Sequence, residues 1–257
     1  MAFSKLMAFI RHGFTLAKSY KLNFVTHYVS TFVSVLFLYF LDRMFRDAGV
    51  TVIEGGSYFT FLLIGHAISR YLELGMRSFA ENLREEMLRG TIEPLLATAT
   101  PTHMALLAPS MWMLIEGTVL VFVQFGLGAL LGADLDQANW LSTLVVWLLS
   151  LACLLCYGIL SASFTLIFKR SDPVNWLIGS ISYVFSGIFF PISILPPWLR
   201  IISYVLPFTY AVSGLRGTLM RGAGLGQISR DVLALLLFTV LLVPFSLWAM
   251  RLAIRHL

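Results

Sequence analysis

Long apolar runs, separated by short polar stretches, follow one another along the whole chain. Residues 22–41 form an uncharged run between Lys21 and Asp42, and residues 140–168 form a longer one. Further apolar stretches lie within residues 103–131, 173–190 and 232–250. A helix that crosses a membrane needs about 20 mostly apolar residues. The pattern therefore predicts an all-α integral membrane protein.

One more crossing is expected to begin at residue 58. Residues 58–69 are apolar, but the helical pattern then continues through Arg70, Glu73 and Arg77. This brings the expected number of transmembrane helices to six. For residues 173–190, the expected end of the helix is Pro191, because proline disrupts a helix interior.

Composition narrows the class of protein. Charged residues make up 12% of the 257 residues, against about 25% in soluble domains, and the mean hydropathy is +0.85. Such a chain fits one membrane domain over residues 1–257. The net charge of +5 needs no nucleic-acid partner, because membrane proteins concentrate Lys and Arg in their inner loops. Cys153 and Cys156 are interpreted as buried small side chains, since no second cysteine pair completes a metal or redox site.

Lys and Arg are unevenly divided between the segments that join the expected spans. With the N-terminus in the cytoplasm, inner segments hold eleven of these residues and outer segments hold six. Four of the six lie in the long segment after residues 173–190, and long segments count little in the positive-inside rule. We therefore expect both chain ends inside, with residues 134–139 and 200–226 outside.

Residues 1–20 have the pattern of an amphipathic helix. The charged residues lie off one apolar face, which is shared by Phe3, Leu6, Met7, Ile10, Phe14 and Ala17. Such a helix lies in the inner membrane interface. Its role is either to anchor the chain or to contact a cytoplasmic partner.

Residues 189–208 are apolar enough to span a membrane but contain four prolines, at 191, 196, 197 and 207. In the topology above this stretch begins and ends outside, so it cannot cross. We expect a re-entrant or interfacial excursion over residues 191–213, with a short helix that begins at Pro196 and Pro197 and ends before Pro207. Trp198 is suited to the headgroup level.

A charged stripe follows residues 58–69 at helical spacing. Its members are His66, Arg70, Glu73, Arg77 and Glu81. Charges at membrane depth face a protein interior or water, and they pair; Arg70 and Glu73 are spaced to do so. The stripe either lines the inner mouth of a pathway or faces a partner subunit, or it is the solvated face of a helix that projects into the cytoplasm.

Two polar residues lie inside the expected third span. Glu116 lies near its middle, and Gln124 follows two turns later. Glu116 is expected to be a structural group paired with Arg70. The alternatives are a protonated structural carboxyl group and a polar route shared with Gln124.

Residues 84–104 form a cytoplasmic segment in this topology. Gly90 suits the C-cap of the preceding helix, and Thr91 and Pro94 suit the start of a short one. Leu95 and Leu96 would then be apolar side chains on a loop facing water. They either dock another protein or pack under the bundle. The sequence contains no phosphate-binding GxxxxGK[ST] loop.

Two motifs resemble a known family. They are RGTIEPLLATATP, after the second expected span, and SGIFFPISILPPWLRIISYVLPFTYAVSGLRG, before the last. With six spans and an N-terminal interface helix, the chain resembles the permease subunit of type-2 ATP-binding cassette exporters. It is most similar to drug-efflux and nodulation-factor export permeases, with O-antigen and teichoic-acid exporters as cousins.

This resemblance implies a bacterial inner-membrane permease that works as a dimer, most simply a homodimer, with two ATPase subunits. ATP and Mg²⁺ would be bound by the ATPase, so this chain would be no enzyme and hold no cofactor or metal of its own. The coupling helix would lie within residues 84–100 and include Gly90, Thr91, Glu93, Pro94, Leu95 and Leu96. An external re-entrant cap would include Pro191, Pro196, Pro197, Trp198, Pro207 and Tyr210.

The expected function is export of an amphiphile such as a lipid-linked glycan, a glycolipid or a hydrophobic drug. The alternative is a channel or secondary carrier that needs no ATP. A carrier built from paired repeats would show two similar halves, and this sequence shows no convincing repeat. A membrane-embedded enzyme would need a convergent polar site that the sequence does not provide.

Overall fold

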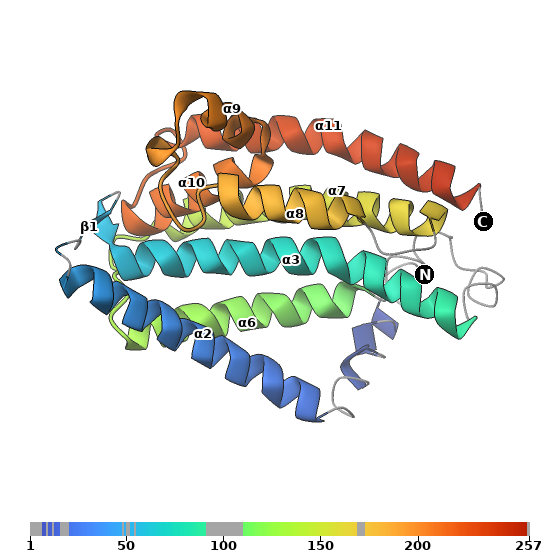
Figure 1. Cartoon of the computed structure of the whole chain (residues 1–257), viewed down its shortest axis with the longest axis horizontal. Helices are drawn as coiled ribbons and strands as arrows, with labels where there is room; N and C mark the ends of the chain where they lie inside the picture. Colours follow the sequence, from blue (N-terminus) through green and yellow to red (C-terminus); the bar gives the residue numbers. More distant parts are fainter. Residues whose placement is uncertain are drawn as a thin grey trace.

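Helices run along the length of the molecule and alternate in direction (Figure 1). The computed structural model describes residues 7–8, 10–11, 13–15, 21–47, 49, 52–53, 55–90, 110–168 and 173–255. The helices that run in this direction are α2 (Lys21–Asp47), α3 (Tyr58–Arg89), α6 (Met111–Leu130), α7 (Trp140–Phe168), α8 (Pro173–Phe185) and α11 (Ser229–Ile254). The chain is thus predominantly helical, as predicted.

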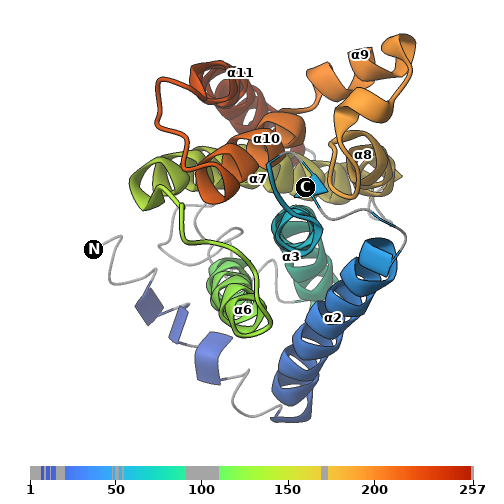
Figure 2. The ribbon, with the colours of Figure 1, turned by 90° about the vertical axis from the view of Figure 1, so that its left-hand side faces the viewer.

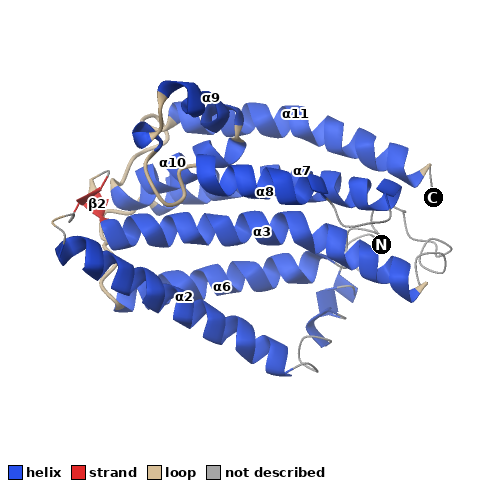
Figure 3. Ribbon diagram, in the orientation of Figure 1, coloured by secondary structure: helices blue, strands red, loops and turns tan. Residues whose placement is uncertain are grey.

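The other described elements gather at one end of the bundle (Figure 3). The two-residue strands β1 (Val52–Ile53) and β2 (Gly56–Ser57) pair antiparallel between α2 and α3. The 3₁₀ helix η2 (Ile192–Ile194) and helices α9 (Pro197–Val205) and α10 (Pro207–Met220) lie between α8 and α11. We call residues 186–220 the η2–α9–α10 segment.

Among the described helices, four are long and apolar enough to cross a membrane by length and composition: α2, α6, α7 and α11. The bounds of α7 are those predicted, and α2 and α11 extend beyond their predicted limits. Helix α3 has 32 residues but carries charges along its second half. Helix α8 has only 13 residues. These two helices therefore do not meet the criterion that the other four meet.

Local sequence signals explain where several helices begin. The Ser57 hydroxyl accepts a 3.1 Å hydrogen bond from the Thr60 amide at the start of α3, and the Asn139 side chain accepts one of 3.2 Å from the Ser142 amide at the start of α7. Both are N-cap interactions. Pro197 and Pro207 are the first residues of α9 and α10, where the missing amide hydrogen costs nothing.

Helix α8 ends at Phe185, so the prediction that it continues to residue 190 and is stopped by Pro191 is wrong. Gly187, with a φ of +78°, already breaks the helix upstream of the proline. Pro191 instead precedes η2 as its N-cap residue. The irregular backbone before Pro191 therefore belongs to the turn that leaves α8.

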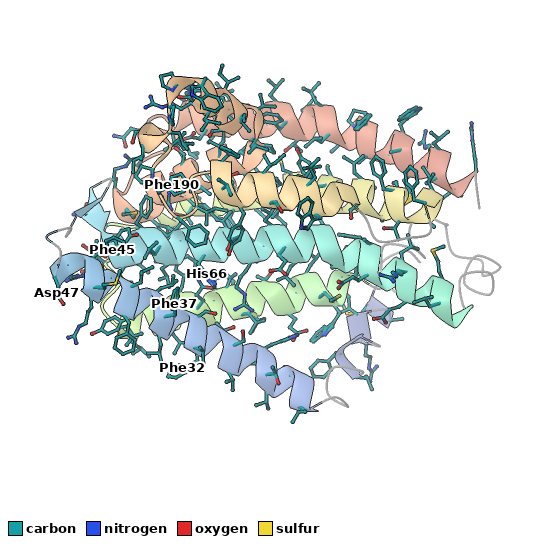
Figure 4. All side chains as sticks on the ribbon, in the orientation of Figure 1. Phe32, Phe37, Phe45, Asp47, His66 and Phe190 are labelled. Carbon is teal, nitrogen blue, oxygen red and sulfur yellow. The ribbon has the colours of Figure 1, made fainter. Side chains whose placement is uncertain are left out.

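Helix α3 lies at the centre of the bundle, with α2, α6, α7, α8 and α10 around it (Figure 2). Its first half contributes to the main core, where Phe59, Phe61 and Ile64 are at most 1% exposed. Many apolar side chains point outward instead, among them Phe32 and Phe37 of α2 (Figure 4). Apolar groups on the outside and polar groups within are the arrangement expected in a lipid environment.

The N-terminal amphipathic helix lies partly outside the described residues. Those that are described, residues 7–8, 10–11 and 13–15, are helical. The Phe14 ring packs edge-on against Trp112 near the start of α6, with the ring centroids 5.2 Å apart. This segment therefore contacts the same end of the bundle at which α6 begins.

Candidate functional site

Among the described side chains, two polar contacts join α2 to its neighbours. His27 Nδ1 lies 3.0 Å from Glu116 Oε1 of α6. One turn further along α2, the guanidinium of Arg70 on α3 donates a 2.7 Å hydrogen bond to Thr31 Oγ1. His27 and Thr31 are four residues apart and so share one face of α2. That single polar face meets both α3 and α6.

A second group of polar contacts joins α3 to α6. The Gln124 side chain is completely buried; its Nε2 donates a 2.9 Å hydrogen bond to the Leu63 carbonyl, and its Oε1 lies 3.2 Å from His66 Nδ1. Figure 4 shows His66 on the side of α3 that faces α6. The Tyr71 hydroxyl donates a 2.6 Å hydrogen bond to Thr118 Oγ1. We call these contacts, together with those of α2, the polar network.

The structure places the predicted stripe partly inside and partly outside the bundle. His66 and Arg70 belong to the polar network, whereas Glu73 and Glu81, further along α3, are exposed. The Arg77 side chain lies outside the described residues. The Arg70 guanidinium donates its hydrogen bond to Thr31, and the proposed ion pair between Arg70 and Glu73 stays a prediction.

The sequence suggests that Glu116 pairs with Arg70. In the structure, Glu116 pairs with His27 instead. The reason is that α2 packs against both α3 and α6 and supplies a separate partner to each. Sequence reasoning missed His27 because residues 22–41 were treated only as an uncharged run. The available signal was the four-residue spacing of His27 and Thr31 within that run. In the structure, Val35 and Leu38 on the same face are buried.

The η2–α9–α10 segment contains all the residues of the predicted external cap. Pro196 precedes α9 and Pro197 begins it, as predicted, and Pro207 begins α10. Trp198 is 68% exposed. The Tyr210 hydroxyl donates a 2.9 Å hydrogen bond to the Tyr204 carbonyl, which ties α10 back to α9.

Arginine side chains satisfy irregular backbone in this segment. Arg200 donates from Nε to the Leu195 carbonyl at 2.8 Å, and from its terminal nitrogen to the Ser193 carbonyl. Ser193 lies within η2 and Leu195 directly follows it, where helical hydrogen bonds are interrupted. Such backbone is tolerated at membrane depth only where protein or water satisfies it.

Arg216 on α10 is the most deeply buried cation among the described residues, at 3% exposure. It donates to the carbonyls of Gly187 at 2.6 Å, Ile188 at 2.7 Å and Phe61 at 3.2 Å. Its guanidinium also lies 3.3 Å from the centre of the Phe61 ring. Sequence reasoning counted Arg216 only as an outer charge. A lone arginine among the small and apolar residues of α10 was the signal for a buried role.

The predicted coupling segment is described only at its start. Helix α3 ends at Arg89, and Gly90 follows with a φ of +69° and an amide that donates to the Met87 carbonyl at 3.2 Å. This confirms Gly90 as the residue that terminates the helix. Thr91, Glu93, Pro94, Leu95 and Leu96 lie outside the described residues.

The two cysteines are free and buried, as predicted. Cys153 Sγ lies 3.1 Å from Thr239 Oγ1, which joins α7 to α11. Within the described residues, no group of three or more His, Cys, Asp or Glu side chains could hold a metal ion.

Comparison with known proteins places these features in a family. No curated protein matches the chain. The family model described as ABC-2 type transporter matches residues 14–220, which include every element from α2 to α10. Members of this family are membrane components of ABC exporters, which in general work with an ATPase partner. The chain belongs to the ABC-2 type transporter family.

Proposed function

We propose that this chain is the six-span permease subunit of an ATP-driven exporter in a bacterial inner membrane. Two copies form the transport pathway between them, and two separately encoded ATPase subunits bind ATP and Mg²⁺ on the cytoplasmic side. The chain itself catalyses no bond chemistry. Its cargo is an amphiphile of the kind moved by drug-efflux or nodulation-factor permeases, namely a lipid-linked glycan, a glycolipid or a hydrophobic drug.

The observation that carries this proposal, beside family membership, is the placement of the connections. Because the long helices alternate in direction, Gly90 after α3 and the end of α11 lie at one end of the bundle, and the start of α2 points the same way (Figure 1). The η2–α9–α10 segment lies at the opposite end. This matches a permease whose termini and ATPase contact are cytoplasmic and whose re-entrant cap is external.

The length of α3 supports its role as a span despite its charges. Its 32 residues extend about 48 Å at about 1.5 Å per residue, whereas the hydrocarbon core is about 30 Å thick. The helix can therefore cross and still project into the cytoplasm. With Tyr58 at the outer surface, His66 and Arg70 lie at membrane depth, and Glu81 lies near or beyond the inner surface.

The polar network supports the assignment of residues on α3 and α6 to the lining of the pathway. Its charged members lie at membrane depth, where ionisable groups are costly and mark functional interiors. We assign six residues to the pathway or to polar positions within the membrane: His66, Arg70, Glu73, Arg77, Glu116 and Gln124. We assign the docking of the ATPase to residues 91–98, which directly follow the end of α3.

The test is reconstitution with the ATPase encoded beside this chain. The two proteins are co-expressed and purified, and then inserted into lipid vesicles that contain fluorescent amphiphiles of the three cargo classes. Movement of at least one class across the bilayer is expected only with ATP, Mg²⁺ and an ATPase whose nucleotide site is intact.

The control uses the same vesicles with an ATPase that binds but does not hydrolyse ATP. Equal movement in that control, or movement by the permease alone, would refute ATP-driven export. It would favour the channel or secondary carrier.

A further inference from the structure

Arg216 holds three separate parts of the chain together. It extends from α10, its terminal nitrogens bond the Gly187 and Ile188 carbonyls in the turn after α8, and one of them also bonds the Phe61 carbonyl of α3. The Phe61 ring lies against the guanidinium. Arg216 is thus a direct link between the η2–α9–α10 segment and the central helix.

The side chain at this position is suited to a link of this kind. A guanidinium has several donors in one rigid plane, so it can bond more than one carbonyl and lie against a ring at once. A lysine ammonium is a single point charge on a flexible stem and cannot reproduce that arrangement. A buried cation is also weak evidence for stability, because taking a charge out of water is costly. Packing alone therefore does not account for the burial of Arg216, whose donors hold three backbone carbonyls.

Helix α3 approaches the turn after α8 without a side chain between them. A Cβ atom on Gly65 would collide with the Ile188 carbonyl oxygen, and it would lie 2.8 Å from a terminal nitrogen of Arg216. Gly65 and Phe61 are four residues apart, so they present one face of α3 to this turn. Backbone contact and the arginine link occur at the same place.

Helix α3 continues from this face to Gly90, next to the segment that we assign to the ATPase. A movement imposed on its inner end can therefore reach Phe61 and Gly65 along one continuous helix. We propose that Arg216 is a positioning residue that couples the η2–α9–α10 segment to α3, so that ATP binding at one end changes the position of that segment at the other. This inference rests on the proposed function.

The experiment follows a single cysteine at Ser193, an exposed residue of η2, in a permease that lacks Cys153 and Cys156. The complex with the ATPase is labelled by a membrane-impermeant thiol reagent, without nucleotide and after trapping with ATP and vanadate. With Arg216 present, the labelling rate is expected to differ between the two states. With Arg216→Gln, the difference is expected to be lost while ATP hydrolysis continues. With Arg216→Lys, most of it is expected to be lost.

The matched control is Arg221→Gln, which removes the same charge from an exposed position just after α10. It is expected to keep the difference in labelling rate between the two states. A purely structural role for Arg216 would lower the yield of folded complex but leave this difference in whatever complex forms.

The outcomes separate this inference from the proposed function. If the unaltered complex hydrolyses ATP but Ser193→Cys labels equally in both states, or if Arg216→Gln and Arg216→Lys respond as the unaltered complex does, the coupling role is refuted and the exporter is not. If the Arg216→Gln permease does not assemble with the ATPase, the labelling rates of the Arg216→Lys complex in the two states provide the same test. If no ATPase binds the chain, the proposed function fails, and the inference fails with it.

Discussion

At the scale of single residues, Thr31 and Thr26 of α2 offer a matched comparison. Both hydroxyls donate to the carbonyl four residues earlier at 2.8 Å. Thr31 is fully buried and also accepts the hydrogen bond of Arg70, whereas Thr26 is exposed. The difference between them isolates the contact with Arg70.

Thr31→Val is expected to lower the free energy of unfolding by about 1–3 kcal/mol, because a partly buried charged donor loses its acceptor. Thr26→Val is expected to change it by less than about 0.5 kcal/mol, as is usual for exposed positions. Chemical unfolding in detergent, followed by tryptophan fluorescence, measures both. Equal losses would show that the bond to Arg70 contributes nothing.

The contact between His27 and Glu116 calls for a double-mutant cycle. Because His27 is 43% exposed, we expect a coupling energy of only about 0.5–1 kcal/mol between His27→Ala and Glu116→Ala. The same unfolding measurement, on both single variants and the double variant, gives this value. Strictly additive losses would mean that the two helices are not held together by this pair.

At the scale of elements, the paired prolines before α9 set the bend that precedes it. Pro196→Ala with Pro197→Ala removes two residues that disfavour a continuous helix by about 3 kcal/mol each at interior positions. Helix can then extend back toward η2. We expect a protein that folds and binds its ATPase but transports cargo poorly, measured in the vesicle assay.

The control for that change is Pro244→Ala, which removes a proline from inside α11, far along the chain from the bend. It is expected to leave transport intact. Normal transport in the Pro196 and Pro197 double variant would show that the shape of the η2–α9–α10 segment does not matter for function.

The proposed ATPase contact lies in the segment after α3. Leu95→Asp with Leu96→Asp would place charges in an apolar contact, where an unpaired charge is strongly unfavourable. We expect normal membrane insertion but loss of ATPase binding, measured by co-purification. Leu225→Asp, at an exposed position in the turn before α11, is the control and should bind normally. An ATPase that remains bound to the double variant would place the contact elsewhere.

Elements with strong local signals could be predicted closely, and others could not. Helix α7 is a long uncharged run that starts after Asn139, and its bounds were predicted to the residue. Helix α10, which contains Gly214 and Gly217, was not predicted, because residues 191–213 were expected only as a re-entrant or interfacial excursion. In the structure these glycines pack closely against Val146 and Ile228, a tertiary advantage that no local pattern shows.

At the scale of the whole molecule, the partners in the candidate site depend on which helices become neighbours. The sequence alone identifies polar residues in the apolar helices, namely His66, Arg70, Glu116 and Gln124. That Glu116 meets His27, and that Arg216 reaches Phe61, required the packing of α2 on α6 and of α10 on α3. These contacts join residues 89 and 155 positions apart, beyond the reach of periodicity.

The most direct test of the central claim is the position of each end of the bundle relative to the membrane. Single cysteines are placed at Asp136, Gly226 and Ser171 in a background without Cys153 and Cys156. Asp136 and Gly226 are exposed, and a Cβ at Gly226 meets nothing within 4 Å. In intact cells, an impermeant thiol reagent is expected to label Asp136→Cys and Gly226→Cys but not Ser171→Cys, which should react only after the cells are opened. Labelling of Ser171→Cys alone in intact cells would place the η2–α9–α10 segment in the cytoplasm and contradict the exporter described here.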